Sequence, residues 1–179
     1  MSGGKIYYSV RVYNETTGNW DSVATDNYAL TPGLGLYLWM GNSTSSFSPF
    51  TFDTRGIPNY GNVNRAVTKN SSGSNLIGNP YESPISWTLF QGANSGVIGS
   101  TLYIFDETTG NWESSDGSTG SGGRVASNPD IIPAHQGFMV AAGTTGTVTF
   151  KENQKTSTDA SVIRAIPPSP EDMLKISLT

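Results

Sequence analysis

The sequence predicts an all-β protein, an antiparallel β-sandwich built from two related halves. Three observations support this fold class. Apolar residues alternate with a period of two along much of the chain, which is the pattern of half-buried strands. Polarity comes from Ser, Thr and Asn, and 21 glycines and 10 prolines punctuate the chain, which favours turns over helices. An octapeptide with the chemistry of a hairpin occurs twice.

The predicted strands follow the alternation along the whole chain. In the first one, Ile6, Tyr8, Val10 and Val12 fall on one face. The other predicted strands are Leu34–Met40, Phe50–Asp53, Asn62–Thr68, Thr101–Phe105, Gly137–Ala142, Thr145–Lys151 and Met173–Leu178. Turn-rich runs separate them, at residues 41–48, 69–74, 114–129 and 153–160. We expect no helix, because no stretch has a 3.6-residue periodicity.

The repeated octapeptide reads Tyr-Asn-Glu-Thr-Thr-Gly-Asn-Trp at residues 13–20 and Phe-Asp-Glu-Thr-Thr-Gly-Asn-Trp at residues 105–112, which is 92 residues later. We expect both copies to form β-hairpins. Gly18 and Gly110 can take a positive φ without a Cβ clash. Trp20 and Trp112 can pack across the strands against the first aromatic residue of their copy. These four residues are therefore predicted to be structural.

Each copy precedes an apolar strand that contains a glycine, Gly35 or Gly137, and these glycines are 102 residues apart. The second copy therefore holds ten more residues, which the Gly/Ser-rich run 116–123 supplies as a loop. We expect one domain over residues 1–165, with pseudo-repeats at about 5–69 and 75–155. Residues 166–179 are expected to be a linker and a strand that leads to, or closes against, a following domain. No signal peptide opens the chain. Its first residues, Met1 to Gly4, have the character of an artificial start, so we expect a fragment of a longer polypeptide.

Acidic residues in the two turns raise Ca²⁺ binding as an alternative to a plain hairpin. The second copy has Asp106 and Glu107, and the first has only Glu15. A Ca²⁺ loop gathers six or more oxygen ligands, often from several carboxylates. We therefore predict plain hairpins and no metal site.

Composition excludes several classes of function. Only 13% of residues are charged, the net charge is −4 and no basic cluster occurs, so we expect no nucleic-acid partner. No stretch has the roughly 18 apolar residues of a spanning helix, so we expect no membrane insertion. There is no cysteine, and His135 is the sole histidine, which excludes disulfides, thiolate sites and histidine relays. Because Asp106 and Glu107 are adjacent in sequence, they do not naturally bracket a sugar. We expect no enzyme and no cofactor.

One pair of aromatic residues suggests binding. If Leu34, Leu36 and Leu38 face the core, then Tyr37 and Trp39 share the opposite face and form a platform that suits apolar sugar faces. The alternative is that these rings pack on the hairpin aromatics in a second core layer. Both interpretations remain open at this point.

The segment Asn-Leu-Ile-Gly-Asn-Pro-Tyr-Glu-Ser-Pro-Ile-Ser-Trp at residues 75–87 resembles a signature of large surface and secreted proteins of the Bacteroidetes. The elements Gly56–Gly61 and Pro133–Phe138 are similar to parts of the same family. Glu82 and Ser86 depart from the usual Pro and Asp. The resemblance implies a β-sandwich region near the C-terminus of type IX secretion system cargo proteins, and thus an extracellular or cell-surface location. It implies no enzymatic reaction.

The sequence therefore predicts a non-catalytic structural or adhesion module of a secreted or cell-surface bacterial protein. Its expected partners are the neighbouring domains of the same polypeptide. The alternative is a carbohydrate-binding module that targets an attached enzyme to polysaccharide, with glycans as partners.

Overall fold

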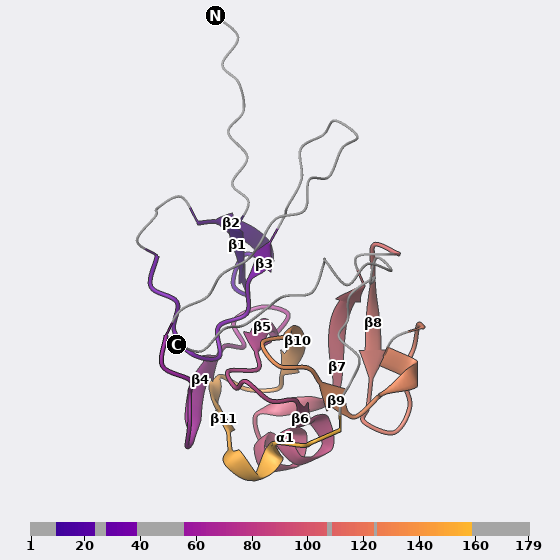
Figure 1. Ribbon diagram of the computed structural model, residues 1–179. Coiled ribbons are helices and arrows are strands. Elements are labelled where there is room, and N and C mark those ends of the chain that lie inside the picture. The colour runs from indigo at the N-terminus through magenta and orange to yellow at the C-terminus, as the bar shows by residue number, and fades with distance from the viewer. Residues whose placement is uncertain (1–9, 24–27, 39–55, 107–108, 124, 159–179) are drawn as a thin grey trace, which may run out of the picture.

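The computed structural model describes residues 10–23, 28–38, 56–106, 109–123 and 125–158 (Figure 1). In these ranges the chain is all-β, with eleven strands and one α-helix. Several predictions fall outside the described residues: the start of the first strand, the strands at 50–53 and 173–178, Trp39, and the segment 166–179.

Every ladder between the described strands is antiparallel. The largest sheet has the order β5-β10-β7-β8, from β5 (Ser74–Gly78), β7 (Ile98–Asp106), β8 (Asn111–Ser115) and β10 (Gly137–Ala142). A second sheet, β2-β1-β3, consists of β1 (Val10–Asn14), β2 (Asn19–Ser22) and β3 (Tyr37–Leu38). Two ribbons complete the set: β4 (Val63–Val67) with β11 (Gly146–Phe150), and β6 (Ile85–Ser86) with β9 (Ile131–Ile132). The helix is α1 (Trp87–Asn94), and 3₁₀ turns lie at Val125–Ser127 and Glu152–Gln154.

The sequence repeat is a repeat of structure over three strands. The order β2-β1-β3 in the first copy corresponds to β8-β7-β10 in the second. Arg11 pairs with Tyr37 in the first unit, and Tyr103 pairs with Met139 in the second. Arg11 and Tyr103 are 92 residues apart, and Tyr37 and Met139 are 102 residues apart, which are the two offsets of the sequence repeat. The ribbon strands β4 and β11, which follow the two units along the chain, pair with each other.

Both octapeptides form the predicted hairpins with equivalent turns. Gly18 N–H donates to the carbonyl of Asn14 (2.9 Å), and Gly110 N–H donates to the carbonyl of Asp106 (2.8 Å). The φ angles of the two glycines are +67° and +70°. Glycine is strongly favoured here because this left-handed conformation brings the Cβ of most other residues too close to the backbone.

We expect Gly110→Val and Gly18→Val each to lower the free energy of unfolding by at least about 1 kcal/mol, because a β-branched residue strains the backbone at positive φ. An added Cβ at Gly110 meets no atom of the described residues within 4 Å, so the expected loss comes chiefly from backbone strain. Gly110→Asn is the matched control, since Asn tolerates this region better. Urea unfolding in which the Val and Asn variants are equally stable would contradict the backbone argument.

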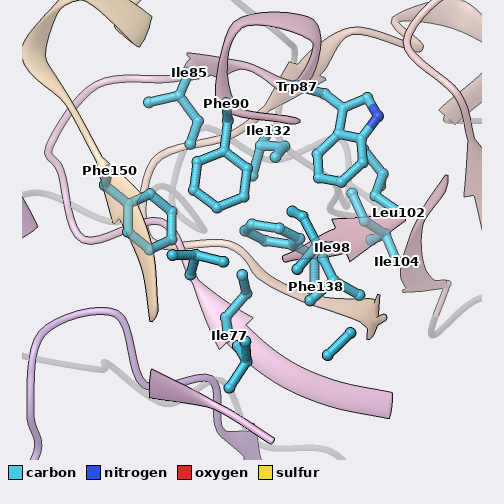
Figure 2. Packing of buried hydrophobic residues seen from close by; sticks show 14 of the residues in the cluster. Ile77, Ile85, Trp87, Phe90, Ile98, Leu102, Ile104, Ile132, Phe138 and Phe150 are labelled. Atoms are coloured by element: carbon cyan, nitrogen blue, oxygen red, sulfur yellow. The ribbon is translucent and has the colours of Figure 1, made fainter. Parts of the chain in front are cut away.

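The hydrophobic core lies between one face of the largest sheet, the helix α1 and the ribbon strand β11 (Figure 2). Phe90 of α1 stacks on Phe150 at a centroid distance of 4.5 Å, and Phe138 meets Phe90 edge-on at 5.9 Å. Trp87 is fully buried in the same cluster. The other large members of the cluster include Ile77, Tyr81, Ile85, Ile98, Leu102, Ile104, Ile132 and Val140.

The helix α1 is an element that the sequence analysis wrongly excluded. Its inward residues Trp87, Phe90 and Asn94 are spaced by three and four, as a helix requires. One of these positions is polar and the helix has only eight residues, so the apolar periodicity is too short to detect. Ser86 caps the N-terminus through its side chain, and Asp130 accepts a hydrogen bond from the backbone N–H of Thr88 (2.7 Å).

The strand predicted over Leu34–Met40 begins only at Tyr37 in the structure, because the segment before it has another partner; residues 39 and 40 lie outside the described ranges. Leu34 forms an isolated bridge with β5, whereas Tyr37 and Leu38 pair with β1. The leucines do not form a core face: Leu34 and Leu36 are half-buried and Leu38 is 39% exposed. Strands β5, β6 and β9 were not predicted, and β8 extends into a run predicted as turns.

Candidate functional site

Five aromatic rings form a continuous row that joins the two hairpins. In order they are Tyr13, Trp20, Tyr37, Phe105 and Trp112, and neighbouring ring centroids are 5.2–5.8 Å apart. Tyr13 and Trp20 are a cross-strand pair of the β1–β2 hairpin, and Phe105 and Trp112 are the equivalent pair of β7–β8. Tyr37 of β3 connects the two pairs. The row therefore binds one structural repeat to the other.

The row does not form a flat platform. Neighbouring ring planes are inclined by 50–73°, which is close to the edge-to-face arrangement that packed aromatic rings prefer. Tyr37 is half-buried with a ring on either side, as the packing alternative describes. Trp112 ends the row and is 40% exposed. The other residue of the predicted platform, Trp39, lies outside the described residues.

Glu15, in the turn of the first hairpin, is a buried carboxylate that holds the loop at residues 68–73. Its Oε1 accepts hydrogen bonds from the backbone N–H groups of Ser71 (2.7 Å) and Gly73 (2.8 Å). Its Oε2 accepts from the backbone N–H of Asn70 and the hydroxyl of Thr68, both at 3.0 Å. The carboxylate is therefore a tether between two segments far apart in the sequence.

The tether predicts a pH dependence of stability. Desolvation raises the pKa of Glu15, but the hydrogen bonds from the loop outweigh it and lower the pKa from 4.5 to about 2. Because the folded pKa is the lower one, the stabilisation by Glu15 is complete above about pH 4.5 and is lost as the pH falls to about 2. We expect Glu15→Gln to melt several degrees below the wild type at pH 7, with the difference shrinking over this range. Calorimetry that finds a constant difference would contradict the assignment.

The second hairpin has a tether on its second strand. Glu113 of β8 is buried, and its two oxygens accept hydrogen bonds from the backbone N–H groups of Gly123 and Val125, both at 2.9 Å. Asp106 accepts a hydrogen bond from the hydroxyl of Thr109 (2.9 Å) within the turn. Its sequence neighbour Glu107 lies outside the described residues. These described carboxylates thus contact donors of the chain itself.

The segment 75–87, on which the resemblance to surface proteins rests, forms hydrogen bonds within the chain. Asn79 is buried, and its Nδ2 donates to the carbonyls of Ser83 and Pro133 (both 2.9 Å) and of Ile132 (3.4 Å). Its Oδ1 accepts from the backbone N–H of Tyr81 (3.1 Å). One side chain therefore joins the tight turn after β5 to the segment that precedes β10.

An open groove of about 520 Å³ lies along the edge of β4. Its walls are the β4 segment 62–66, the loop residues Asn59 and Tyr60, and the pair Thr31 and Pro32. Three asparagines, Asn59, Asn62 and Asn64, are among the lining residues. This groove combines hydrogen-bonding groups with an exposed aromatic ring.

The loop that carries Tyr60 is held in place by three hydrogen bonds. Asn59 Nδ2 donates to the carbonyl of Pro80 (2.8 Å), and Gly61 N–H donates to Glu152 Oε1 (2.7 Å). The hydroxyl of the buried Tyr81 donates to the carbonyl of Gly61 (2.6 Å). Tyr60 itself is 84% exposed. A large ring displayed on an anchored loop is well placed to contact a ligand.

Arg65 is the one charged side chain among the residues that line the groove. It is half-buried, and its Nη1 donates to the hydroxyl of Thr31 (3.2 Å). Its Nε is buried and has no acceptor in the described part of the chain. None of the ion pairs among the described residues includes Arg65. Burial lowers the pKa of Arg65, and the electrostatic interaction with Tyr28 partly offsets this decrease.

The remaining titratable candidates give no cluster. His135 lies in a loop at φ 57°, and its Nε2 is 2.8 Å from Oε2 of Glu82, the residue that departs from the signature's usual proline. Within the described ranges, no group of three His, Cys, Asp or Glu residues is arranged to hold a metal ion. A search of the same ranges for a helix long and apolar enough to cross a membrane finds none.

Sequence reasoning missed the role of Glu15 as a tether and the positions of Tyr60 and Arg65 in the groove. The partners of Glu15 follow it by more than fifty residues, so no local pattern reveals the tether. Tyr60 gave a usable signal, because Pro58-Asn59-Tyr60-Gly61 reads as a turn with an aromatic residue near its tip. Arg65 alternates with apolar residues in a predicted strand, and its place in the groove depends on Thr31 from a distant segment.

The comparisons with known proteins place the chain in one family. The model of a family described as Domain of unknown function (DUF8693) matches residues 2–165. No curated protein matches the chain, and no solved structure matches it. The matched segment includes all of the described strands and the helix. The chain therefore belongs to this family, the domain of unknown function DUF8693.

Proposed function

We propose that the chain is a non-catalytic structural or adhesion module of a secreted or cell-surface bacterial protein. The observation that carries this proposal is the use of its distinctive residues. Asn79 of the signature, Glu15 of the first hairpin and the aromatic row each join segments that are distant in sequence. Such residues build a scaffold. The resemblance of residues 75–87 to surface proteins of the Bacteroidetes supports the location.

The partners in this proposal are the neighbouring domains of the same polypeptide, which the module spaces and displays. Carbohydrate binding is the second candidate, and the groove along β4 favours it, since amide groups beside an exposed ring suit sugar hydroxyls and apolar sugar faces. The flat platform of Tyr37 and Trp39 is not needed for this candidate.

The structural proposal is tested in cells that produce the parent polypeptide. We expect an antibody against the module to label intact cells or the culture medium. Removing residues 10–158 should reduce the surface display of the adjoining domains. Replacement by an unrelated β-sandwich of equal size is the control, and we expect it to restore display if the module acts as a spacer. Confinement of the protein to the cytoplasm would overturn the proposal.

A further inference from the structure

The groove along β4 contains a cation without a described counter-ion. A guanidinium that is half-buried loses part of its hydration and is normally compensated by a carboxylate or by several acceptors. Arg65 has one acceptor, the hydroxyl of Thr31, and its buried Nε has none in the described part of the chain. A Cβ added at Gly33 would lie 3.2 Å from Arg65 Cβ and 3.6 Å from its Cγ, so the Gly33 backbone lies close to the base of this side chain. An under-compensated guanidinium at a groove favours an anionic ligand.

The other groups around the groove restrict the kind of anion. Asn64 uses its Oδ1 to accept from the hydroxyl of Thr149 (2.9 Å), and its Nδ2 has no partner among the described residues. Asn62 is exposed beside it. Tyr60 also lines the groove, and its side chain is exposed. Amides and an aromatic face are the groups that bind hydroxyls and the apolar face of a sugar ring.

We propose that this groove binds a carboxylated sugar of an acidic polysaccharide. Arg65, on one face of β4, pairs with the carboxylate of a sugar unit, and the ring of Tyr60 packs on an apolar sugar face. Asn62 and Asn64, on the other face of the strand, bond hydroxyls where the polymer crosses the edge of β4. An acidic peptide would satisfy Arg65 but would leave the exposed ring and the amides without a specific role. The inference adds a ligand to the proposed adhesion role, and its failure leaves the purely structural role intact.

Affinity electrophoresis through gels that contain polygalacturonate tests the proposal. We expect retention by polygalacturonate and at least about tenfold weaker retention by the same polymer after reduction of its carboxyl groups, because a charge-assisted pair contributes more than a neutral one. Poly-glutamate gels are the second comparison, and we expect no retention there. Equal retention by the acidic and reduced polymers, or equal retention by poly-glutamate, would overturn the assignment. So would the absence of any retention.

Variants locate the site. We expect Arg65→Gln and Tyr60→Ala each to weaken retention about tenfold or more. Arg65→Lys keeps the charge but loses the planar fork, so it should bind more weakly than the wild type. Arg11→Gln is the matched control, since it removes the same charge from another half-buried arginine outside the groove, and it should bind normally. Tyr60 is exposed, so Tyr60→Ala reports on binding even if Arg65→Gln fails to fold. Wild-type retention of the folded Tyr60→Ala and Arg65→Lys variants would refute the site.

Discussion

Phe90→Ala should lower the free energy of unfolding by about 3–5 kcal/mol, the usual cost of removing a buried phenylalanine. The ring stacks on Phe150 at 4.5 Å and meets Phe138 and Trp87 at 5.9 Å, so it contacts the sheet and the ribbon strand β11 from the helix (Figure 2). Its removal leaves a cavity at the centre of the core. Urea unfolding followed by tryptophan fluorescence measures the loss.

Leu89→Ala is the control, because Leu89 is the preceding residue of the same helix and is 52% exposed. It changes helix propensity little, and we expect a loss within about 0.5 kcal/mol. Comparable losses for the two variants would mean that α1 does not pack on the sheet through Phe90.

Asn79→Ala should have the second large effect, a loss of about 3 kcal/mol or more. The substitution removes the side-chain partner of the carbonyls of Ser83 and Ile132 and of the backbone N–H of Tyr81, and each group left unsatisfied in a buried site costs roughly 1–3 kcal/mol. The carbonyl of Pro133 keeps its hydrogen bond from the backbone N–H of Gln136 (3.2 Å). The measured loss is smaller than the sum of these costs if water enters the space left by the Asn79 side chain and bonds to the exposed groups. Urea unfolding measures this loss as well.

Asn62→Ala provides the comparison, since this asparagine is exposed and makes no hydrogen bond with the described residues. We expect its stability to remain within about 0.5 kcal/mol of the wild type. If Asn79→Ala were equally mild, the signature at residues 75–87 would need an explanation other than architecture.

The sequence predicted what depends on local periodicity. Strand β10 has the predicted bounds, Gly137–Ala142, and the turns at Gly18 and Gly110 have the predicted positive φ. The helix α1 escaped because the polar Asn94 takes one of its inward positions, where it bonds to the backbone of β11. The strand predicted to begin at Leu34 begins later, because Leu34 pairs with β5 of the largest sheet whereas Tyr37 and Leu38 pair with β1 of the second sheet.

The candidate site was beyond sequence reasoning for a different physical reason. Aromatic alternation directed attention to Tyr37, yet its surroundings are set by Trp20 and Phe105, which come from two separate hairpins. The groove likewise combines Thr31, the loop at Tyr60 and the edge of β4. Contacts of this kind depend on tertiary packing, which periodicity within a single segment does not encode.

The pairing of β4 with β11 determines when the molecule can fold during synthesis. Val63 finds its partner in Phe150, and Val67 finds its partner in Gly146, so this ladder closes only after nearly all of the described chain has left the ribosome. Contacts between such distant residues require a large loop to close first, which slows folding. Until then β4 remains an unpaired edge and Phe90 lacks the ring on which it stacks, a state prone to association with other chains. We therefore expect a nascent chain to complete this part of its core only after β11 has been synthesised.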